Sequence, residues 1–152
     1  MIPRGAAPHR RTGLAANPEL PAFSRRRRRT ISMLTPLVFR PLYRRYIWGG
    51  RGFAAVFGRD LPPGDDYAES WELVDRGTDQ SVVAEGPWSG RSLGELVREH
   101  GHAMLGSHDG ERFPLLFKFL DACRDLSVQV HPDDARAARL SQPDLGKTEA
   151  WY

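Results

Sequence analysis

An alternating pattern of apolar and polar residues covers the segment from Asp125 to Pro132. The apolar positions are Leu126, Val128 and Val130, and the polar positions between and after them are Ser127, Gln129 and His131. Successive side chains of a β-strand point to opposite sides, so this period of two predicts a strand. We expect the apolar side of the strand to pack in a core and the polar side to line a site where chemistry occurs.

Two further apolar segments predict a β-hairpin in an antiparallel sheet. Residues 71–74 and residues 81–84 are rich in strand-forming side chains, and residues 75–79 between them have the composition of a turn. Shorter strand-like pieces occur at residues 37–39 and 46–48, followed by glycine-rich positions that predict a loop over residues 49–52.

Helical patterns interrupt these strands at two places. Ser92 and Glu95 have the spacing of a capping box, and the apolar residues that follow share one helical face. We therefore expect a helix over residues 93–100 that ends at Gly101. A second helix is predicted over residues 135–140, because a proline and two acidic residues precede it. Short strands with inserted helices are typical of a mainly β protein of the α+β class.

The charge of the chain is unevenly distributed. The formal net charge is +3, but residues 1–32 contain eight arginines and one glutamate, which leaves residues 33–152 with a net charge of −4. The first 32 residues have little apolar surface to bury, and this predicts a disordered, Arg-rich tail. The tail could be a nucleic-acid-binding arm or a targeting segment, or translation could begin at Met33 and exclude it. The acidic remainder makes nucleic acid an unfavoured partner.

The remaining composition narrows the class of protein. A single cysteine, Cys123, excludes an internal disulfide and fits a reducing cytoplasm, and its neighbours predict that it is buried or half-buried. No apolar run approaches the roughly 20 residues that a membrane-spanning helix needs. We therefore expect a cytoplasmic protein that has no membrane partner.

Three polar side chains suit a divalent metal ion. Gln129 offers an amide oxygen, His131 a ring nitrogen and Glu149, eighteen residues later, a carboxylate. Such a mixed nitrogen and oxygen set suits zinc or a similar cation. Each residue also has an ordinary structural interpretation, namely a cross-strand hydrogen bond for Gln129, a helix-start position for His131 and a surface acid for Glu149.

The lysines provide an argument that does not depend on a metal. Arginine occurs twenty times in the chain and lysine only twice, at Lys118 and Lys147. This composition uses arginine wherever a generic cation is sufficient, so we expect the two lysines to need a compact ammonium group. We predict that they bind substrate oxygens or tune proton transfer. The alternative for Lys118 is a snorkelling side chain whose charged end reaches water.

Five motifs, in order and spacing, resemble those of type I phosphomannose isomerase. They are residues 46–50 (YIWGG), 69–72 (ESWE), 113–118 (FPLLFK), 129–132 (QVHP) and 146–152 (GKTEAWY). The resemblance, from about Leu34 to Tyr152, implies a cupin-type antiparallel jelly roll with short inserted helices. It also implies a metal-dependent enzyme that interconverts two sugar phosphates, mannose 6-phosphate and fructose 6-phosphate.

The resemblance assigns roles to individual residues. It implies one Zn²⁺ per chain, bound by Gln129, His131 and Glu149, although other divalent cations would also fit these ligands. It implies active-site roles for Lys118, Ser127 and Lys147. The family's remaining metal-binding histidine and a pocket arginine lie beyond Tyr152, so we expect residues 33–152 to be the N-terminal part of a cupin domain truncated at its C-terminus. A companion chain could supply the other half.

Three functional hypotheses remain at the level of sequence. The leading one is a mannose-6-phosphate isomerase whose isolated 152-residue chain has little activity. The alternatives are a non-catalytic zinc-binding cupin fragment and an Arg-tailed nucleic-acid-binding protein. The sequence does not identify the general base that isomerisation requires. Glu72 is a candidate, but an outward-facing acid on a strand explains it at least as well.

Overall fold

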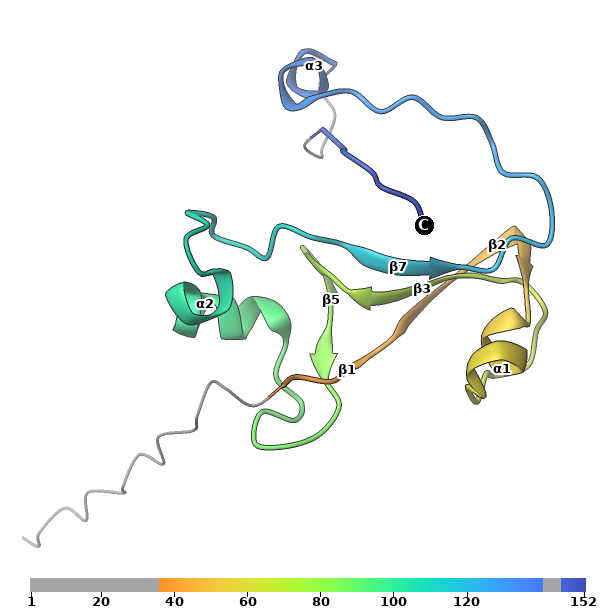
Figure 1. Ribbon diagram of the computed structural model, residues 1–152, viewed down its shortest axis with the longest axis horizontal. Coiled ribbons are helices and arrows are strands. Elements are labelled where there is room, and N and C mark those ends of the chain that lie inside the picture. Colours follow the sequence, from red (N-terminus) through yellow and green to blue (C-terminus); the bar gives the residue numbers. More distant parts are fainter. Residues whose placement is uncertain (1–35, 141–145) are drawn as a thin grey trace, which may run out of the picture. The chain divides into compact units, whose positions relative to one another are not determined.

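The computed structural model describes residues 36–140 and 146–152, all within one compact unit, Ser32–Tyr152 (Figure 1). The predicted disorder of residues 1–32 lies outside the described residues. Where the chain is described, none of its helices has the length and apolar character needed to cross a membrane.

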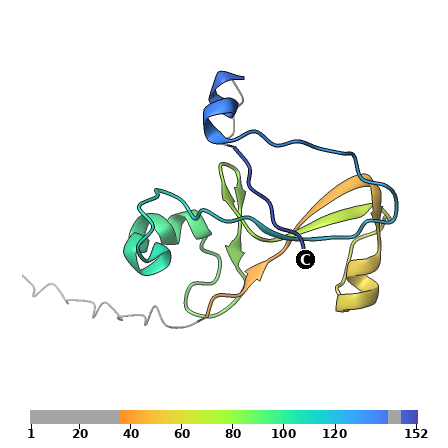
Figure 2. The same ribbon diagram turned by 45° about the horizontal axis from the view of Figure 1, so that its top comes forward.

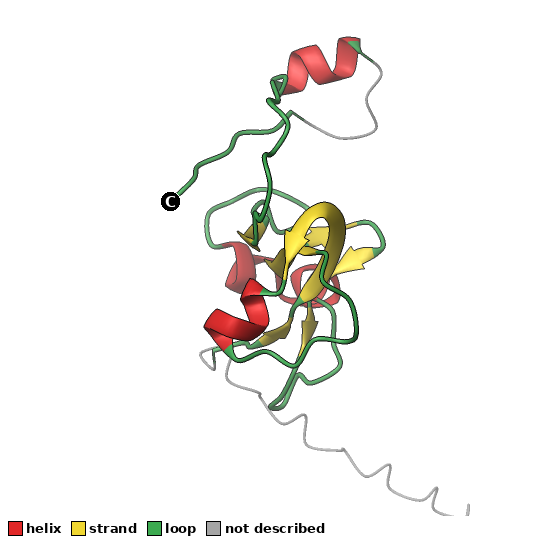
Figure 3. Cartoon of the chain, turned by 90° about the vertical axis from the view of Figure 1, so that its right-hand side faces the viewer, coloured by secondary structure: helices red, strands yellow, loops and turns green. Residues whose placement is uncertain are grey.

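The central element is a three-stranded antiparallel sheet in the order β2-β3-β7. Its strands are β2 (Leu42–Gly50), β3 (Tyr67–Leu73) and β7 (Phe117–Leu120). Two smaller antiparallel pairs accompany it, β1 (Phe39–Arg40) with β6 (Val82–Val83), and β4 (Asp75–Arg76) with β5 (Asp79–Gln80). Antiparallel strands and short helices, coloured by type in Figure 3, confirm the predicted mainly β class.

The core lies around the middle strand and the first helix. Residues 67–70 of β3 are all buried, as expected for a strand with a neighbour on each side. Phe53, Leu61 and Tyr67 form a cluster against which Tyr43 and Phe119 pack. This packing makes β3 and β7 a rigid platform for any side chain that they carry.

The helix predicted after Ser92 is confirmed at its start and is longer than expected. Helix α2 (Leu93–Leu105) begins with a complete capping box, in which Ser92 Oγ accepts from Glu95 N at 3.2 Å and Glu95 Oε2 accepts from Ser92 N at 2.8 Å. Gly101 does not end it. The chain kinks at His100 (φ −131°, ψ 29°) and remains helical to Leu105.

The other helices are short. Helix α3 (Asp134–Arg139) confirms the predicted second helix, with Asp133 as its N-cap accepting from Arg136 N at 2.8 Å. Helix α1 (Gly52–Phe57) occupies part of the predicted glycine-rich loop, while Gly49 and Gly50 belong to β2. A Cβ at Gly49 would lie 2.6 Å from Ala68 N, so this glycine permits close strand packing rather than a loop.

A hairpin is present where one was predicted, but the predicted strands do not form it. Its paired strands, β4 and β5, occupy the predicted turn and its edge, and Gly77 takes the positive φ of +50° between them. Residues 71–73 belong instead to the central sheet, and residues 82–83 pair with β1. Cys123 is exposed, against expectation, because it lies just beyond β7 where the chain leaves the sheet.

The predicted strand over residues 126–131 is not formed. Those residues belong to the long loop between β7 and α3 (Figure 1), and residues 124–131 make no backbone hydrogen bond to any described residue. Val128 is 100% exposed and Val130 is 92% exposed, so the apolar side expected in the core faces solvent. A strand requires a neighbouring strand, and the described residues provide none at this position.

Candidate active site

One pocket of about 220 Å³ is lined by all six side chains selected from the sequence. They come from three places: Lys118 from β7, Ser127, Gln129 and His131 from the loop after it, and Lys147 and Glu149 from the C-terminal residues. The remaining lining residues are Trp48, Glu69, Leu120, Leu126 and Trp151. The C-terminal residues return from α3 towards the sheet in Figures 1 and 2, which brings the end of the chain to this pocket.

The predicted alternation is kept over residues 127–131 without the strand, although Leu126, expected on the apolar side, also lines the pocket. Ser127, Gln129 and His131 line the pocket, whereas the valines between them, Val128 and Val130, are almost fully exposed. The local backbone is therefore extended enough to place polar side chains on one side. Burial of the other side needs a partner that the described residues do not supply.

Lys147 and Glu149 are placed by contacts at the start of α3. Gly146 N donates to Asp134 Oδ1 at 2.8 Å, and Lys147 N donates to the carbonyl of Pro132 at 3.1 Å. A Cβ at Gly146 would lie 2.3 Å from the carbonyl carbon of Asp133, so only glycine fits this close approach. The glycine of the GKTE motif therefore joins the C-terminal segment to the segment that carries His131.

His131, Glu149 and Lys147 form one polar cluster. His131 Nε2 lies 2.9 Å from Glu149 Oε2, Lys147 Nζ lies 2.5 Å from Glu149 Oε1, and Lys147 Nζ lies 3.4 Å from His131 Nε2. The hydrogen bond from Lys147, followed by the contact with His131, lowers the pKa of Glu149 below its ordinary value. The carboxylate is therefore kept ionised, as a metal ligand must be.

Gln129 is oriented by its neighbour on the same side of the loop. Its Nε2 donates to Ser127 Oγ at 2.9 Å, and both residues are exposed. Because this bond uses the amide nitrogen, the amide oxygen is left for another partner. An oxygen from Gln129, a nitrogen from His131 and a carboxylate from Glu149 are compatible with zinc in their donor chemistry.

The structure adds Glu69, which sequence reasoning did not select. Glu69 is 8% exposed, accepts from Lys118 Nζ at 2.8 Å and accepts from Trp71 Nε1 at 2.6 Å. Its position within the ESWE motif could have identified it as a pocket residue, but the prediction from sequence considers only Glu72 of that motif. Glu72 lies in an ion pair with Arg59 at 2.8 Å and does not line the pocket, which supports its interpretation as a structural acid.

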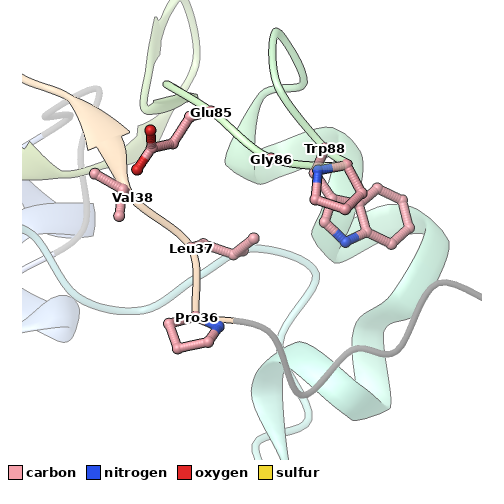
Figure 4. A pocket seen from close by; sticks show the side chains of 7 residues that line it. Pro36, Leu37, Val38, Glu85, Gly86 and Trp88 are labelled. Carbon is pink, nitrogen blue, oxygen red and sulfur yellow. The ribbon is translucent and has the colours of Figure 1, made fainter.

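Other features of the described residues do not offer comparable chemistry. No group of three His, Cys, Asp or Glu side chains with metal-binding geometry occurs among them. The predicted metal site contains two such residues, His131 and Glu149, and its third member is Gln129. A second pocket, of about 280 Å³, lies beside β1 (Figure 4). Its lining residues are Pro36, Leu37, Val38, Glu85, Gly86, Pro87 and Trp88, of which only Glu85 is ionisable.

Comparison with known proteins identifies the family of the chain. A family model described as phosphomannose isomerase type I, catalytic domain, matches residues 37–148. The mannose-6-phosphate isomerase ManA of Bacillus subtilis (strain 168) is 45% identical over 117 residues, covering 77% of this chain and 36% of the relative. The mannose-6-phosphate isomerase of Streptococcus mutans is 41% identical over 120 residues, covering 79% of this chain and 37% of the relative.

A solved structure is similar to this chain in both fold and sequence. The crystal structure of the mannose 6-phosphate isomerase from Bacillus subtilis superimposes with a TM-score of 0.66 at 38% identity, covering 73% of this chain and 35% of that one. This similarity confirms the predicted cupin-type fold. The chain thus spans little more than a third of the length of the relatives that it matches. Because the family model accounts for most of the described residues and includes five of the six selected pocket positions, the chain belongs to the type I phosphomannose isomerase family.

Proposed function

We propose that residues 33–152 form the metal-ligand-bearing part of a mannose-6-phosphate isomerase, which interconverts mannose 6-phosphate and fructose 6-phosphate. The observation that carries the proposal is the meeting of six side chains, chosen for this chemistry from the sequence, in one pocket. Three separate segments contribute to it, so their convergence is not a consequence of proximity along the chain.

In this proposal, Gln129, His131 and Glu149 hold one Zn²⁺ per chain. The donor types support this assignment, as does the 2.9 Å contact between His131 Nε2 and Glu149 Oε2. When bound, the cation would polarise oxygens of the sugar phosphate. These three residues leave coordination positions open for a further protein ligand and for the substrate.

The two lysines and Ser127 act on the substrate directly. Isomerisation moves a proton between C1 and C2 and places negative charge on a substrate oxygen. The ammonium groups of Lys118 and Lys147 can bind phosphate or hydroxyl oxygens and stabilise that charge, and the hydroxyl of Ser127 can donate to a further oxygen. We assign no general base, because Glu149 is used as a ligand and Glu69 already accepts two hydrogen bonds.

The proposal includes a further segment that completes the pocket. Val128 and Val130 expose an apolar side directly behind Ser127, Gln129 and His131. A segment packed against that side, whether on the same polypeptide or on a companion chain, would fix the loop and exclude water from the pocket. We place the complete enzyme in the cytoplasm, consistent with its single cysteine.

The exposed valines also favour one alternative, a cupin fragment that binds zinc without catalysis. A pocket open to water loses both the positioning and the exclusion of solvent on which such chemistry depends. A nucleic-acid-binding protein is less favoured, because residues 33–152 carry a net charge of −4.

A coupled isomerase assay tests the proposal. The purified 152-residue chain should convert mannose 6-phosphate slowly or not at all. A fusion to the C-terminal part of the Bacillus subtilis relative, beyond its matched region, should show turnover that a chelator removes. His131→Ala or Glu149→Gln should abolish that turnover, whereas Glu111→Gln, at an exposed acid outside the pocket, should retain it.

Two results would change the interpretation. A fusion that binds zinc but stays inactive would favour the non-catalytic alternative. Rapid, chelator-sensitive conversion by the isolated chain would mean that the described residues need no completing segment.

A further inference from the structure

The two lysines of the pocket are held in different ways. Lys118 and Glu69 project from neighbouring strands of the central sheet, and their side chains are 20% and 11% exposed. Lys147 and Glu149 project from the C-terminal segment, and their side chains are 32% and 24% exposed. Glu149 also contacts His131. Within the part of the chain that the structure describes, Glu69 forms no hydrogen bond with His131 or Lys147.

The register of the sheet explains why Glu69 reaches Lys118. Trp71 on β3 lies directly opposite Lys118 on β7, and Glu69 lies two residues from Trp71 on the same side of β3. Trp71 Nε1 therefore donates to one carboxylate oxygen of Glu69, at 2.6 Å, while Lys118 Nζ donates to the other, at 2.8 Å. Both oxygens are engaged, which fixes the plane of the carboxylate.

Trp71 is itself held in place. The guanidinium of Arg44 lies 4.3 Å from the centroid of the Trp71 ring, and Arg44 forms an ion pair with Asp79 at 2.5 Å. A chain of contacts therefore runs from the β4–β5 hairpin through Arg44 and Trp71 to Glu69. It ends at the ammonium group of Lys118, which lines the pocket.

We propose that Glu69 is a positioning residue that fixes the ammonium group of Lys118 in the pocket, so that the ammonium binds a substrate oxygen without first being ordered. A free lysine side chain loses considerable rotamer entropy when it binds a ligand, and a partner that orders it beforehand removes that cost. That the substrate oxygen belongs to a sugar phosphate rests on the proposed function. The ordering of Lys118 by Glu69 does not depend on it.

The chemistry of Glu69 suggests a selective substitution. Glutamine has nearly the same shape, but an NH2 group replaces one of the two oxygens, so one of the donors, Lys118 Nζ or Trp71 Nε1, would face another donor, and any bond that Lys118 keeps loses its charged acceptor. Glu69→Gln should therefore release Lys118 with little change in packing. Glu72→Gln is the matched control, because Glu72 lies on the same strand but pairs with Arg59 away from the pocket.

The scarcity of lysine makes a direct experiment practical. A full chain labelled with ¹³C and ¹⁵N in lysine alone gives signals from only two side chains, and Lys147→Arg assigns them. We expect the Lys118 ε-methylene to be ordered in the wild type and its order parameter to fall about twofold in Glu69→Gln. The Lys147 signal should not change, and Glu72→Gln should leave both signals unchanged. Trp71→Phe should have an intermediate effect on Lys118, and it carries the test if Glu69→Gln fails to fold by circular dichroism.

Titration with mannose 6-phosphate then separates the two claims. We expect it to shift the Lys118 signal, with an apparent Kd about tenfold higher in Glu69→Gln than in the wild type. If mannose 6-phosphate shifts neither lysine in the wild type but the order of Lys118 depends on Glu69, the proposed function fails for this chain and the positioning claim stands. Equal order of Lys118 in the wild type and in Glu69→Gln would overturn the positioning claim, as would equal affinities.

Discussion

Two regions of this chain carry strand-forming apolar residues with different results. In the sheet region, residues 67–97, many of these residues are buried, and Ala68, Val74 and Val83 are fully enclosed. In the pocket arm, residues 124–132 and 146–152, alternation orients side chains but buries none of the apolar ones fully. Val83 and Val128, chemically identical, are 0% and 100% exposed.

The difference shows that orientation and burial have separate causes. Orientation follows from an extended backbone, which a segment can adopt by itself. Burial requires a second surface, and the described residues provide it to β3 but not to the pocket arm. The arm therefore carries candidate ligands on one side and an unsatisfied apolar surface on the other. We expect substitutions in the arm to affect ligand binding and substitutions in the sheet region to affect stability.

The largest effect should come from the proposed metal-ligand positions of the arm. If the assignment holds, His131→Ala should lower the affinity of the full chain for Zn²⁺ by about a hundredfold, because it would remove a ligand and not merely a supporting contact. Its unfolding midpoint should barely change. Isothermal titration calorimetry measures the affinity, and His108→Ala, at an exposed histidine outside the pocket, is the control. If His108→Ala weakens binding and His131→Ala does not, the metal site is misassigned.

A matched pair of valines tests the stability side of the comparison. Val83→Ala should destabilise the chain by about 2 kcal/mol, since it leaves a cavity in a closed core. Val128→Ala should cost less than about 0.5 kcal/mol, since the side chain is already in water. Urea denaturation of both variants measures the difference. Equal losses would mean that the arm is packed in solution.

Helix α2 gives a smaller effect within the sheet region. Ser92→Ala removes the capping hydrogen bond to Glu95 N and should cost about 1 kcal/mol. The same denaturation experiment measures it, with Ser89→Ala as the control, because the Ser89 hydroxyl donates to the carbonyl of Ala84 and caps no helix. A cost as small as that of the control would show that the cap contributes little.

The capping box also predicts a pH dependence. The bond from the Ser92 backbone, and then the bond to its side chain, lower the pKa of Glu95 below its ordinary value. A lowered folded-state pKa contributes stability above the ordinary carboxylate range, and the contribution is lost as pH falls through the folded value. The gap in stability between the wild type and Glu95→Gln should therefore narrow as pH falls below the ordinary carboxylate range. A stability difference between the two proteins that stays constant as pH falls to the lowest value at which the chain remains folded would contradict this prediction.

The smallest effect is expected from the Arg-rich tail. Deleting residues 1–32 should change the unfolding temperature by less than about 2 °C, because the segment has little apolar surface to bury. Differential scanning calorimetry tests this. A larger decrease would show that the tail packs on the folded part, and salt-sensitive RNA or DNA binding lost on deletion would favour the nucleic-acid hypothesis.

Local signals in the sequence predicted the local structure well. The capping box located the start of α2, and the acidic residues after Pro132 located α3. The alternation correctly divided pocket-facing from outward-facing side chains in residues 127–131, whereas Leu126, expected on the apolar side, also lines the pocket. These features depend on neighbours within a few residues, which a sequence displays directly.

Features that depend on distant segments were missed or misread. Gly49 was assigned to a loop because nothing nearby reveals that Ala68 passes within contact distance. Glu69 was passed over because its significance comes from Lys118, 49 residues later and on a neighbouring strand. The burial predicted for Val128 and Val130 failed for the same reason, since the pattern signals a partner without identifying it.

The central claim is that the pocket arm is oriented but unsupported by the described residues, and that the proposed completing segment would support it. Amide hydrogen exchange measures this most directly, because β3 is hydrogen-bonded on both sides whereas residues 124–131 make no backbone hydrogen bond to described residues. In the isolated chain, we expect amides of residues 67–71 to be strongly protected and those of residues 127–130 to exchange nearly as fast as in a free peptide. Fusion to the C-terminal part of the Bacillus subtilis relative should slow the second group. Strong protection of residues 127–130 in the isolated chain, unchanged by the fusion, would contradict the account.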